Sequence, residues 1–224
     1  YTNTSDITDM QSGINPKEIL WRGGRDENLS LEEDHFPPSL FGKGRLNPSQ
    51  NLVDAFPMAN GYPIGHALSD YNPNNPYADR DPRLATYIVY NGSKAGNQNT
   101  EIITAVDGTN NDALGRAETS TRTGYYMKKH LRQDVNANPS SQVKQYHYKS
   151  FIRFTEIFLG YAEAANEAWG PTCTGGNGYS AYDVVKAIRA RAGIGAENGD
   201  AYLESVKGDK EAMRTLIHNE RRLE

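Results

Sequence analysis

The pattern of hydrophobic and polar positions divides the chain into two parts of different character. In residues 1–147, short apolar runs alternate with Gly, Pro, Asn and Ser, and few apolar residues recur at helical spacing. In residues 148–224, apolar residues recur every three or four positions, which is typical of amphipathic helices. The pattern predicts a loop-rich segment over 1–147 and a helical scaffold over 148–224.

Three helices are predicted in the second part. The first covers Arg153–Gly170, where Gly170 and Pro171 end it. Its expected apolar stripe consists of Phe151, Thr155, Phe158, Ala162, Ala165 and Trp169. Ser180 caps a second helix, Ala181–Ala192, and Gly193 ends it. A third helix begins near Asp209. Helices joined by loops in this order are typical of antiparallel helical hairpins.

The first of these helices is rich in small residues at its centre, namely Gly160, Ala162, Ala164 and Ala165. A glycine inside a helix costs about 1 kcal/mol relative to alanine. We therefore expect a neighbouring helix backbone to approach closely here and to offset that cost. Leu-Gly followed by spaced alanines also echoes the tetratricopeptide pattern, whose repeating unit is a helix pair. The predicted fold class is mainly α, with tetratricopeptide-like hairpins beside an irregular segment with a few short strands.

Local signals predict four elements in the first part. Glu18–Arg22 is predicted as a strand that ends at the Gly23-Gly24 break. Pro48–Phe56 is predicted as a short helix with Asn47 as its N-cap. Leu84–Tyr90 and Thr123–Lys129 are predicted as strands, and residues 91–121 and 132–145 as loops.

Composition excludes several classes of protein. The 224 residues are 37% hydrophobic and 23% charged, with a net charge of -4, so nothing favours nucleic-acid binding. The single cysteine, Cys173, excludes an intrachain disulfide and a cysteine metal cluster. The polar start YTNTSD and the end at ERRLE, inside a predicted helix, lead us to expect part of a longer protein.

Several motifs occur together in one order. Asn15–Trp21 resembles the "NPEIIF" opening of the C-terminal region of the SusD/RagB family, and Pro48–Met58 resembles its "P-T-Q-E-L-V-D-A-F-x-M" motif. Asp79–Leu84 is similar to the family's "D-x-D-P-R-L", and Gly124–Lys129 to its "G-Y-x-x-x-K".

The resemblance continues through the predicted helices. Arg153–Glu167 resembles "R-x-A-E-v-y-L-x-Y-A-E-A-x-N-E", Ala187–Gly193 resembles "N-x-V-R-x-R-A-G", and Ile217–Glu224 resembles "I-x-x-E-R-R-x-E". Lys186 and Asn60 depart from the usual Asn and Asp, and the "F-E-G-x-R-x-x-D-L" stretch that follows in the family is missing. The resemblance covers nearly the whole chain.

This resemblance implies a surface-exposed lipoprotein of the outer membrane that captures glycans for a TonB-dependent, SusC-like transporter. The lipid anchor would lie outside this chain, and Cys173 is not the lipidated residue. Two alternatives stay open. One is a module that docks the transporter while ligand contacts lie elsewhere in the parent chain, and the other is a peptide-binding or glycoside-hydrolysing protein.

Candidate ligand contacts are aromatic residues in polar surroundings, because sugars stack on aromatic faces and offer hydroxyls to charged or amide groups. The best cluster is Trp21, with Arg22, Arg25, Asp26 and Asn28 as hydrogen-bonding partners. Alternatively, Trp21 ends a strand and packs inward.

Two further candidate pairs of aromatic residues follow along the chain. Phe36 and Phe41 flank Pro37-Pro38, as a second platform or as a hydrophobic anchor of a long loop. Tyr71 and Tyr77 belong to a polar loop suited to stacking.

Catalytic and metal motifs find little support in the sequence. There is no G-x-S-x-G or H-E-x-x-H motif, and no phosphate-binding glycine loop. Glu156, Glu163 and Glu167 lie on successive helical turns, where ion pairing is the favoured interpretation over a glycosidase pair. Asp70 and Asp81 have the spacing of a calcium loop, but Asn75 stands where that loop needs glycine. We expect no enzymatic activity, no cofactor and, at this loop, a solvated turn rather than calcium.

Overall fold

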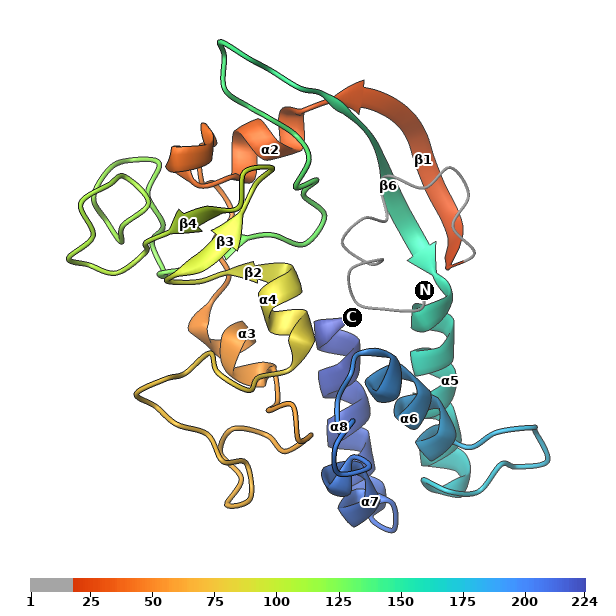
Figure 1. Ribbon diagram of the computed structural model, residues 1–224. Helices are drawn as coiled ribbons and strands as arrows, with labels where there is room; N and C mark the ends of the chain where they lie inside the picture. The colour runs from red at the N-terminus through yellow and green to blue at the C-terminus, as the bar shows by residue number, and fades with distance from the viewer. Residues whose placement is uncertain (1–17) are drawn as a thin grey trace.

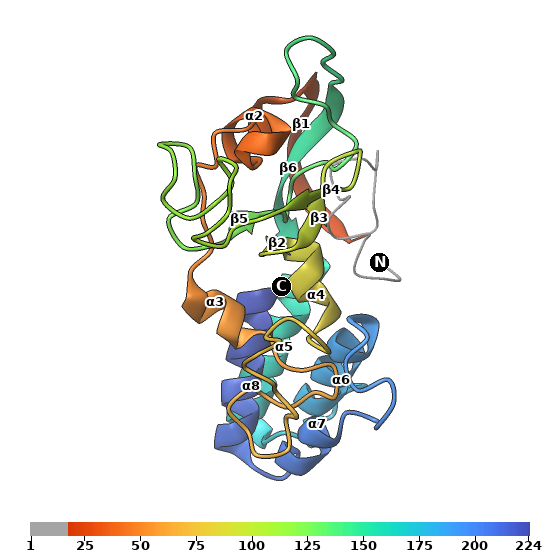
Figure 2. The ribbon, with the colours of Figure 1, turned by 60° about the vertical axis from the view of Figure 1, so that its left-hand side comes forward.

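The computed structural model describes residues 18–224. A long two-stranded ribbon rises at one end of the molecule and a group of helices stands at the other (Figures 1 and 2). The helices are α2 (Ser30–His35), the 3-10 helix η2 (Pro38–Leu40), α3 (Gln50–Ala55), α4 (Pro82–Tyr87), α5 (Phe154–Trp169), α6 (Ala181–Arg191), α7 (Ala201–Val206) and α8 (Lys210–Leu223). Long loops, short helices and small hairpins fill the other side of the view in Figure 1.

Within residues 18–224, each of the three sheets is an antiparallel pair. The ribbon pairs β1 (Ile19–Asn28) with β6 (Gln145–Arg153). The two shorter pairs are β2 (Ile88–Val89) with β5 (Tyr126–Met127) and β3 (Ser93–Ala95) with β4 (Thr100–Ile102). The predicted fold class, mainly helical with a few short strands, is confirmed.

Local capping signals explain where α6 and α8 begin. The Ser180 side chain accepts a hydrogen bond from the Asp183 amide while the Asp183 side chain accepts one from the Ser180 amide, which is a complete capping box. Gly193 follows α6 with φ of +83°, a conformation that glycine adopts at low cost. Asp209 caps α8 through the amides of Glu211 and Ala212. Both predicted helices are confirmed.

The first predicted helix needs correction at its start and on its buried face. Phe151 belongs to β6 and α5 begins at Phe154, with Arg153 as N-cap. The buried residues of α5 are Thr155, Leu159, Ala162, Ala165 and Asn166. Phe158 and Trp169, expected in the stripe, have 41% and 45% of their surface exposed. The buried stripe therefore includes Leu159 and Asn166 in place of Phe158 and Trp169.

The small residues of α5 serve two different faces. Ala162 and Ala165 are buried in the core that α5 shares with α6 and α8, so close helix packing is confirmed for them. Gly160 and Ala164 face away from that core, and a Cβ added to Gly160 would meet no atom within 4 Å. The prediction that Gly160 admits a neighbouring backbone is therefore wrong for the described residues.

The first part of the chain departs more from prediction. β1 does not end at Gly23-Gly24 but continues to Asn28. The N-cap of α3 is Ser49 rather than Asn47, and the helix starts at Gln50. Most of Leu84–Tyr90 is helix, because Asp81 caps the Arg83 amide and Pro82 occupies the first turn.

The remaining differences in this part concern strand lengths. Only Tyr126–Met127 of the predicted strand Thr123–Lys129 forms a β-pair, as β5. The predicted loop 91–121 contains the β3–β4 hairpin. Asn91 and Gly92 form the turn that precedes β3.

A buried network of charges joins the loops to the helices. The Arg83 guanidinium reaches Asp81 at 2.7 Å and Glu220 of α8 at 2.9 Å. Arg189 of α6 binds the other oxygen of Glu220 at 2.7 Å and Asp200 at 2.6 Å. Although burial opposes ionisation, Arg83 and Arg189 hold the pKa of Glu220 below its usual value. The network fixes the first part of the chain against α6 and α8.

Candidate functional site

The β1–β6 ribbon is irregular where the predicted ligand residues lie. Arg22 faces Ser150 and Arg25 faces Tyr148, so two residues, Gly23 and Gly24, are accommodated opposite Lys149 alone. Such a bulge increases the local twist and redirects the side chains on either side of it. The glycines thus shape the strand instead of ending it.

Trp21 and Phe151 form an exposed aromatic pair on this ribbon. Their ring centroids lie 5.2 Å apart at an interplanar angle of 45°. The exposed fractions are 62% for Trp21 and 50% for Phe151. Lys149 places its ammonium 5.5 Å from the Phe151 centroid. The alternative in which Trp21 packs inward is therefore wrong; below, this pair is called the aromatic platform.

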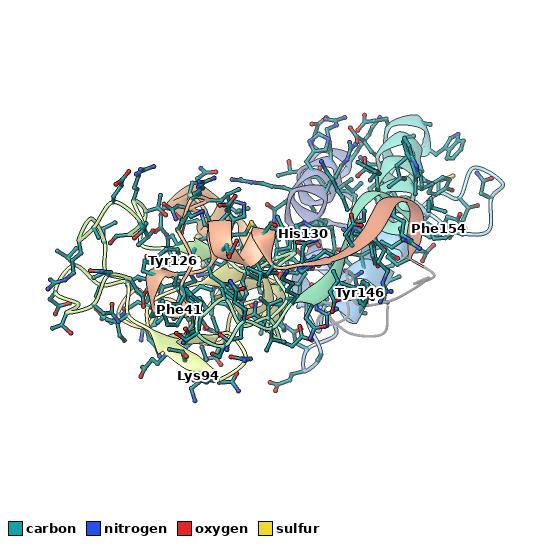
Figure 3. The ribbon with its side chains drawn as sticks, turned by 90° about the horizontal axis from the view of Figure 1, so that it is seen from above. Phe41, Lys94, Tyr126, His130, Tyr146 and Phe154 are labelled. Carbon is teal, nitrogen blue, oxygen red and sulfur yellow. The ribbon has the colours of Figure 1, made fainter. Side chains whose placement is uncertain are left out.

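The two predicted arginines lie against tyrosines of β6. The guanidinium carbon of Arg25 is 3.9 Å from the centroid of the Tyr146 ring, and that of Arg22 is 5.0 Å from the Tyr148 ring. Cation–π contacts of this kind hold a guanidinium in place without using its N–H groups, and one N–H of Arg22 also donates to the Gly23 carbonyl at 3.5 Å. Figure 3 labels Tyr146 on the ribbon.

A cavity of about 540 Å³ lies beside the ribbon. Its wall includes Gly24, Asp26 and Asn28 of β1, Tyr148 of β6, and His130 from the loop after β5. Asp26 is exposed. The Asn28 side chain already makes two hydrogen bonds within the chain. Its oxygen accepts from the Ser30 amide, and its nitrogen donates to the Asp26 carbonyl. Of the predicted polar residues lining this cavity, Asp26 is thus the one whose carboxylate faces solvent.

His130 contributes an uncharged imidazole to the cavity. Burial, together with the positive charges of Lys129 and Arg153, lowers its pKa to about 4. At neutral pH the ring therefore carries one donor and one acceptor nitrogen. The same loop holds Lys129, whose pKa is lowered by burial to about 8 and whose ammonium donates to the Leu223 and Glu224 carbonyls.

Phe36 and Phe41 have opposite environments. Phe36 is 2% exposed and belongs to the interior, so the prediction that it forms a platform is wrong. Phe41, the residue after η2, is 51% exposed. Phe41 lies apart from the ribbon and lines a separate, smaller cleft.

Tyr71 and Tyr77 are not free stacking surfaces. Tyr77 stacks on Tyr90 with centroids 4.2 Å apart, and its hydroxyl is 3.3 Å from that of Tyr125. Burial and the neighbouring tyrosines raise the pKa of Tyr77. Tyr71 packs under the Arg80 guanidinium, 5.5 Å from the ring centroid. Both lie in the segment between α3 and α4, away from the ribbon (Figure 1); the structure does not bring them into one site with Trp21.

Sequence reasoning missed the contribution of β6. Phe151 completes the platform, and Tyr146 and Tyr148 support the two arginines. Residues 132–145 were predicted as a loop and Phe151 as part of a helix stripe, so the strand between them was not expected. The alternation Tyr146-His147-Tyr148 is the period-two signal that could have revealed it.

The carboxylates of α5 are engaged in ion pairs. Glu156 and Glu163 both pair with Arg221 of α8, and Glu167 pairs with Arg214. Two arginines of α6 pair with other carboxylates: Arg189 binds Asp200 and Glu220, and Arg191 binds Glu224. The surface arginines of α8 thus neutralise the carboxylates that a glycosidase pair would have required.

The described part of the chain holds neither a cluster of metal-ligating side chains nor a helix suited to span a membrane. Across residues 18–224, no three His, Cys, Asp or Glu side chains are grouped to hold a metal ion. No helix in this range has the length and apolar character needed to cross a bilayer. The Asn72 side-chain oxygen accepts from the Asn74 amide, as in a local turn.

Comparison with known proteins places the chain among a defined group. A family model described as the SusD family matches residues 15–224. A SusD-like carbohydrate-binding protein from Bacteroides fragilis aligns over 99% of this chain with a TM-score of 0.73 and 23% identity. A second SusD-like protein from Bacteroides fragilis aligns over 99% with a TM-score of 0.66 and 24% identity. The chain spans 42% and 44% of these two structures. A search of curated proteins returned no match.

Proposed function

The chain belongs to the SusD family, and from this membership we propose that it binds glycans at the aromatic platform of Trp21 and Phe151. The observation that carries the proposal is a pair of adjacent aromatic rings on the ribbon, both exposed to solvent. Adjacent exposed apolar side chains often mark a binding site. A sugar ring offers an apolar C–H face to such rings. Stacking removes both apolar surfaces from water.

Polar groups further along the ribbon suit the hydroxyls of the same oligosaccharide. Arg22 and Arg25 are donors held on tyrosine faces, and Asp26 is an exposed acceptor that lines the adjoining cavity. Sites that combine aromatic surface with a few placed polar groups are the usual form of small-molecule recognition. The cavity and the platform together would hold more than one sugar unit.

Family membership also supports proposals about place and partners. We propose that the parent protein is a lipoprotein on the cell surface of the outer membrane, where it delivers glycans to a SusC-like, TonB-dependent transporter. The chain then acts by binding rather than by catalysis. The pairing of Glu156 and Glu163 with Arg221 supports a non-catalytic role, because ion-paired carboxylates are poor general acids.

Titration calorimetry tests the proposal. A glycan array first selects an oligosaccharide that binds the wild-type protein, and the same oligosaccharide is then titrated into variants. Trp21→Ala should weaken binding at least tenfold, about 1.4 kcal/mol, and Phe151→Ala should weaken it in the same direction. Trp169→Ala is the matched control, since Trp169 is also half exposed but lies at the end of α5.

Equal affinities of wild type and Trp21→Ala would reject the platform as the glycan site. The glycan would then bind elsewhere on the protein. A second candidate function is docking of a partner protein. The observation behind it is the exposed apolar surface of α5, where Phe154, Ile157 and Phe158 are all at least 40% exposed. An Ile157→Asp variant that no longer co-purifies with the transporter would support docking.

A further inference from the structure

A second cleft, formed around Phe41, has a different chemical character from the ribbon. It lies between η2, the turn that joins β3 to β4, and the loop of residues 135–141, and it encloses about 100 Å³. Phe41, Asn97, Gln98, Asn136, Asn138 and Ser141 are among its lining residues. A cleft of this volume admits only a few water-sized groups, so a larger ligand would lie across its mouth.

The backbone holds Phe41 in an unusual conformation. Its φ of 65° and ψ of 22° are left-handed, a region in which a bulky side chain is an outlier. Asn or Gly would occupy this position with less strain. The side chain is half exposed, so core packing does not account for a phenylalanine here. Strained positions of this kind cluster at binding sites.

The polar lining is made of amides with unused hydrogen-bonding groups. Asn97 and Gln98 are exposed, and their side chains make no hydrogen bond to any residue from 18 to 224. Asn138 accepts from the Ser140 amide through its side-chain oxygen, which leaves its NH₂ group to point elsewhere. Each free amide offers donors and an acceptor together, as vicinal hydroxyls do.

The lining of this cleft contains no Asp, Glu, Lys, Arg or His, although 23% of the chain is charged. A carboxylate or sulfate entering an uncharged cleft would lose hydration without gaining a counter-ion, which is unfavourable. Uncharged hydroxyls lose less hydration free energy, and the side-chain amides of the cleft can replace their hydrogen bonds to water. The lining therefore favours a neutral, hydroxyl-rich ligand.

The walls of the cleft are fixed before any ligand arrives. Gly96 has φ of +74°, and a Cβ at this position would lie 2.9 Å from Leu40 Cδ2. Its amide donates to the Gln133 side chain at 2.9 Å, and the Asn136 side chain donates to the Ser141 carbonyl at 2.8 Å. The walls of the cleft therefore need little further ordering when a ligand binds, and this lowers the entropic cost of binding.

We infer that the Phe41 cleft is a second saccharide-binding site, selective for uncharged sugars, in which a ring stacks on Phe41 and its hydroxyls meet Asn97, Gln98 and Asn138. Phe41 and Phe154, which begins α5 next to the ribbon, lie toward opposite ends of the view in Figure 3. The two sites are thus separate. The inference shares with the proposed function the premise that the ligand is a saccharide, but not the residues.

Nuclear magnetic resonance of the ¹⁵N-labelled chain tests the inference with maltoheptaose and cellohexaose as neutral probes and oligogalacturonate as an acidic one. At least one neutral probe should shift the side-chain amide signals of Asn97 and Gln98. Phe41→Asn removes the ring but suits the left-handed backbone, so the variant should fold and bind that probe at least tenfold more weakly. Phe41→Tyr should restore binding, and Leu68→Ala, an exposed apolar control, should not change it.

The outcomes separate this site from the platform. Cleft shifts that persist in Trp21→Ala support two independent sites, even where platform binding fails. Absence of these shifts with both neutral probes overturns the inference and leaves the platform untouched. Stronger shifts with oligogalacturonate than with the neutral probes would overturn the proposed selectivity.

Discussion

His130, which lines the cavity beside the ribbon, makes the stability of the fold depend on pH. Its folded pKa of about 4 lies below the value of about 6.5 expected in the unfolded chain. Between these values the unfolded state binds more protons, so this histidine makes the folded state less stable as pH falls from 6.5 to 4. The effect is at most about 3 kcal/mol, at 1.36 kcal/mol per pKa unit.

We expect His130→Asn to flatten this pH dependence. Asparagine tolerates the φ of 71° that His130 adopts and does not titrate. Urea unfolding at pH 7 and pH 4.5 should show a smaller loss of stability in the variant than in wild type. Identical losses would mean that His130 is not held neutral by its surroundings.

Trp21 shows that a sequence can identify a candidate ligand residue without fixing the direction of its side chain. Its neighbours Arg22, Arg25 and Asp26 marked it as a ligand candidate, yet the sequence left open whether the ring faced solvent or the interior. The answer depends on the bulge at Gly23-Gly24 and on Phe151, which is 130 positions away along the chain. On an irregular strand, the face to which a side chain points depends on how the strand pairs with its neighbour. The local sequence does not determine that pairing.

Gly160 is a position in α5 where alanine should stabilise the helix. It lies within α5, faces no neighbour among the described residues, and would accept a Cβ without contact. Gly160→Ala should therefore stabilise the chain by about 0.5–1 kcal/mol through helix propensity. Chemical denaturation measures the change.

Ala162→Gly is the matched comparison, since Ala162 is fully buried against α6 and α8. It should destabilise the chain by about 1 kcal/mol or more from propensity and lost packing. A Gly160→Ala variant that is less stable than wild type would show that some part of the chain contacts this face of α5.

Elements with local signals could be predicted, and those that depend on distant partners could not. The Ser180 cap and Gly193 stop delimit α6 within the sequence itself. Leu84–Tyr90 resembles a strand in composition, but Asp81-Pro82 just before it starts a helix, and this local signal outweighs the composition. The sequence marks β6 only by the short Tyr146-His147-Tyr148 alternation, and its full extent to Arg153 depends on pairing with β1.

The whole molecule depends on buried charges that join its parts. Arg83, in the first part of the chain, is fully buried and binds Asp81, Glu220 and Glu224. Arg83→Met would leave these carboxylates without one of their cations, and we expect a loss of about 3–5 kcal/mol in unfolding free energy. Urea unfolding followed by circular dichroism measures it.

An exposed ion pair provides the control. Arg214 pairs with Glu167 on the surface of α5 and α8, so Arg214→Met should cost about 1 kcal/mol or less. Similar losses for the two variants would show that the buried network does not hold the loops against the helices. The motifs Asp79–Leu84 and Ile217–Glu224 supply Arg83 and Glu220, which explains why both belong to one pattern.

The proposed function depends on a sugar stacking on the aromatic platform, and tryptophan fluorescence tests this stacking most directly. In a Trp169→Phe variant, Trp21 is the only tryptophan. Adding an oligosaccharide that binds by calorimetry should shift its emission to shorter wavelength and saturate with the same affinity. The reciprocal Trp21→Phe protein should show no shift. No change at Trp21 under saturating glycan, or a shift reported by Trp169 instead, would contradict the account.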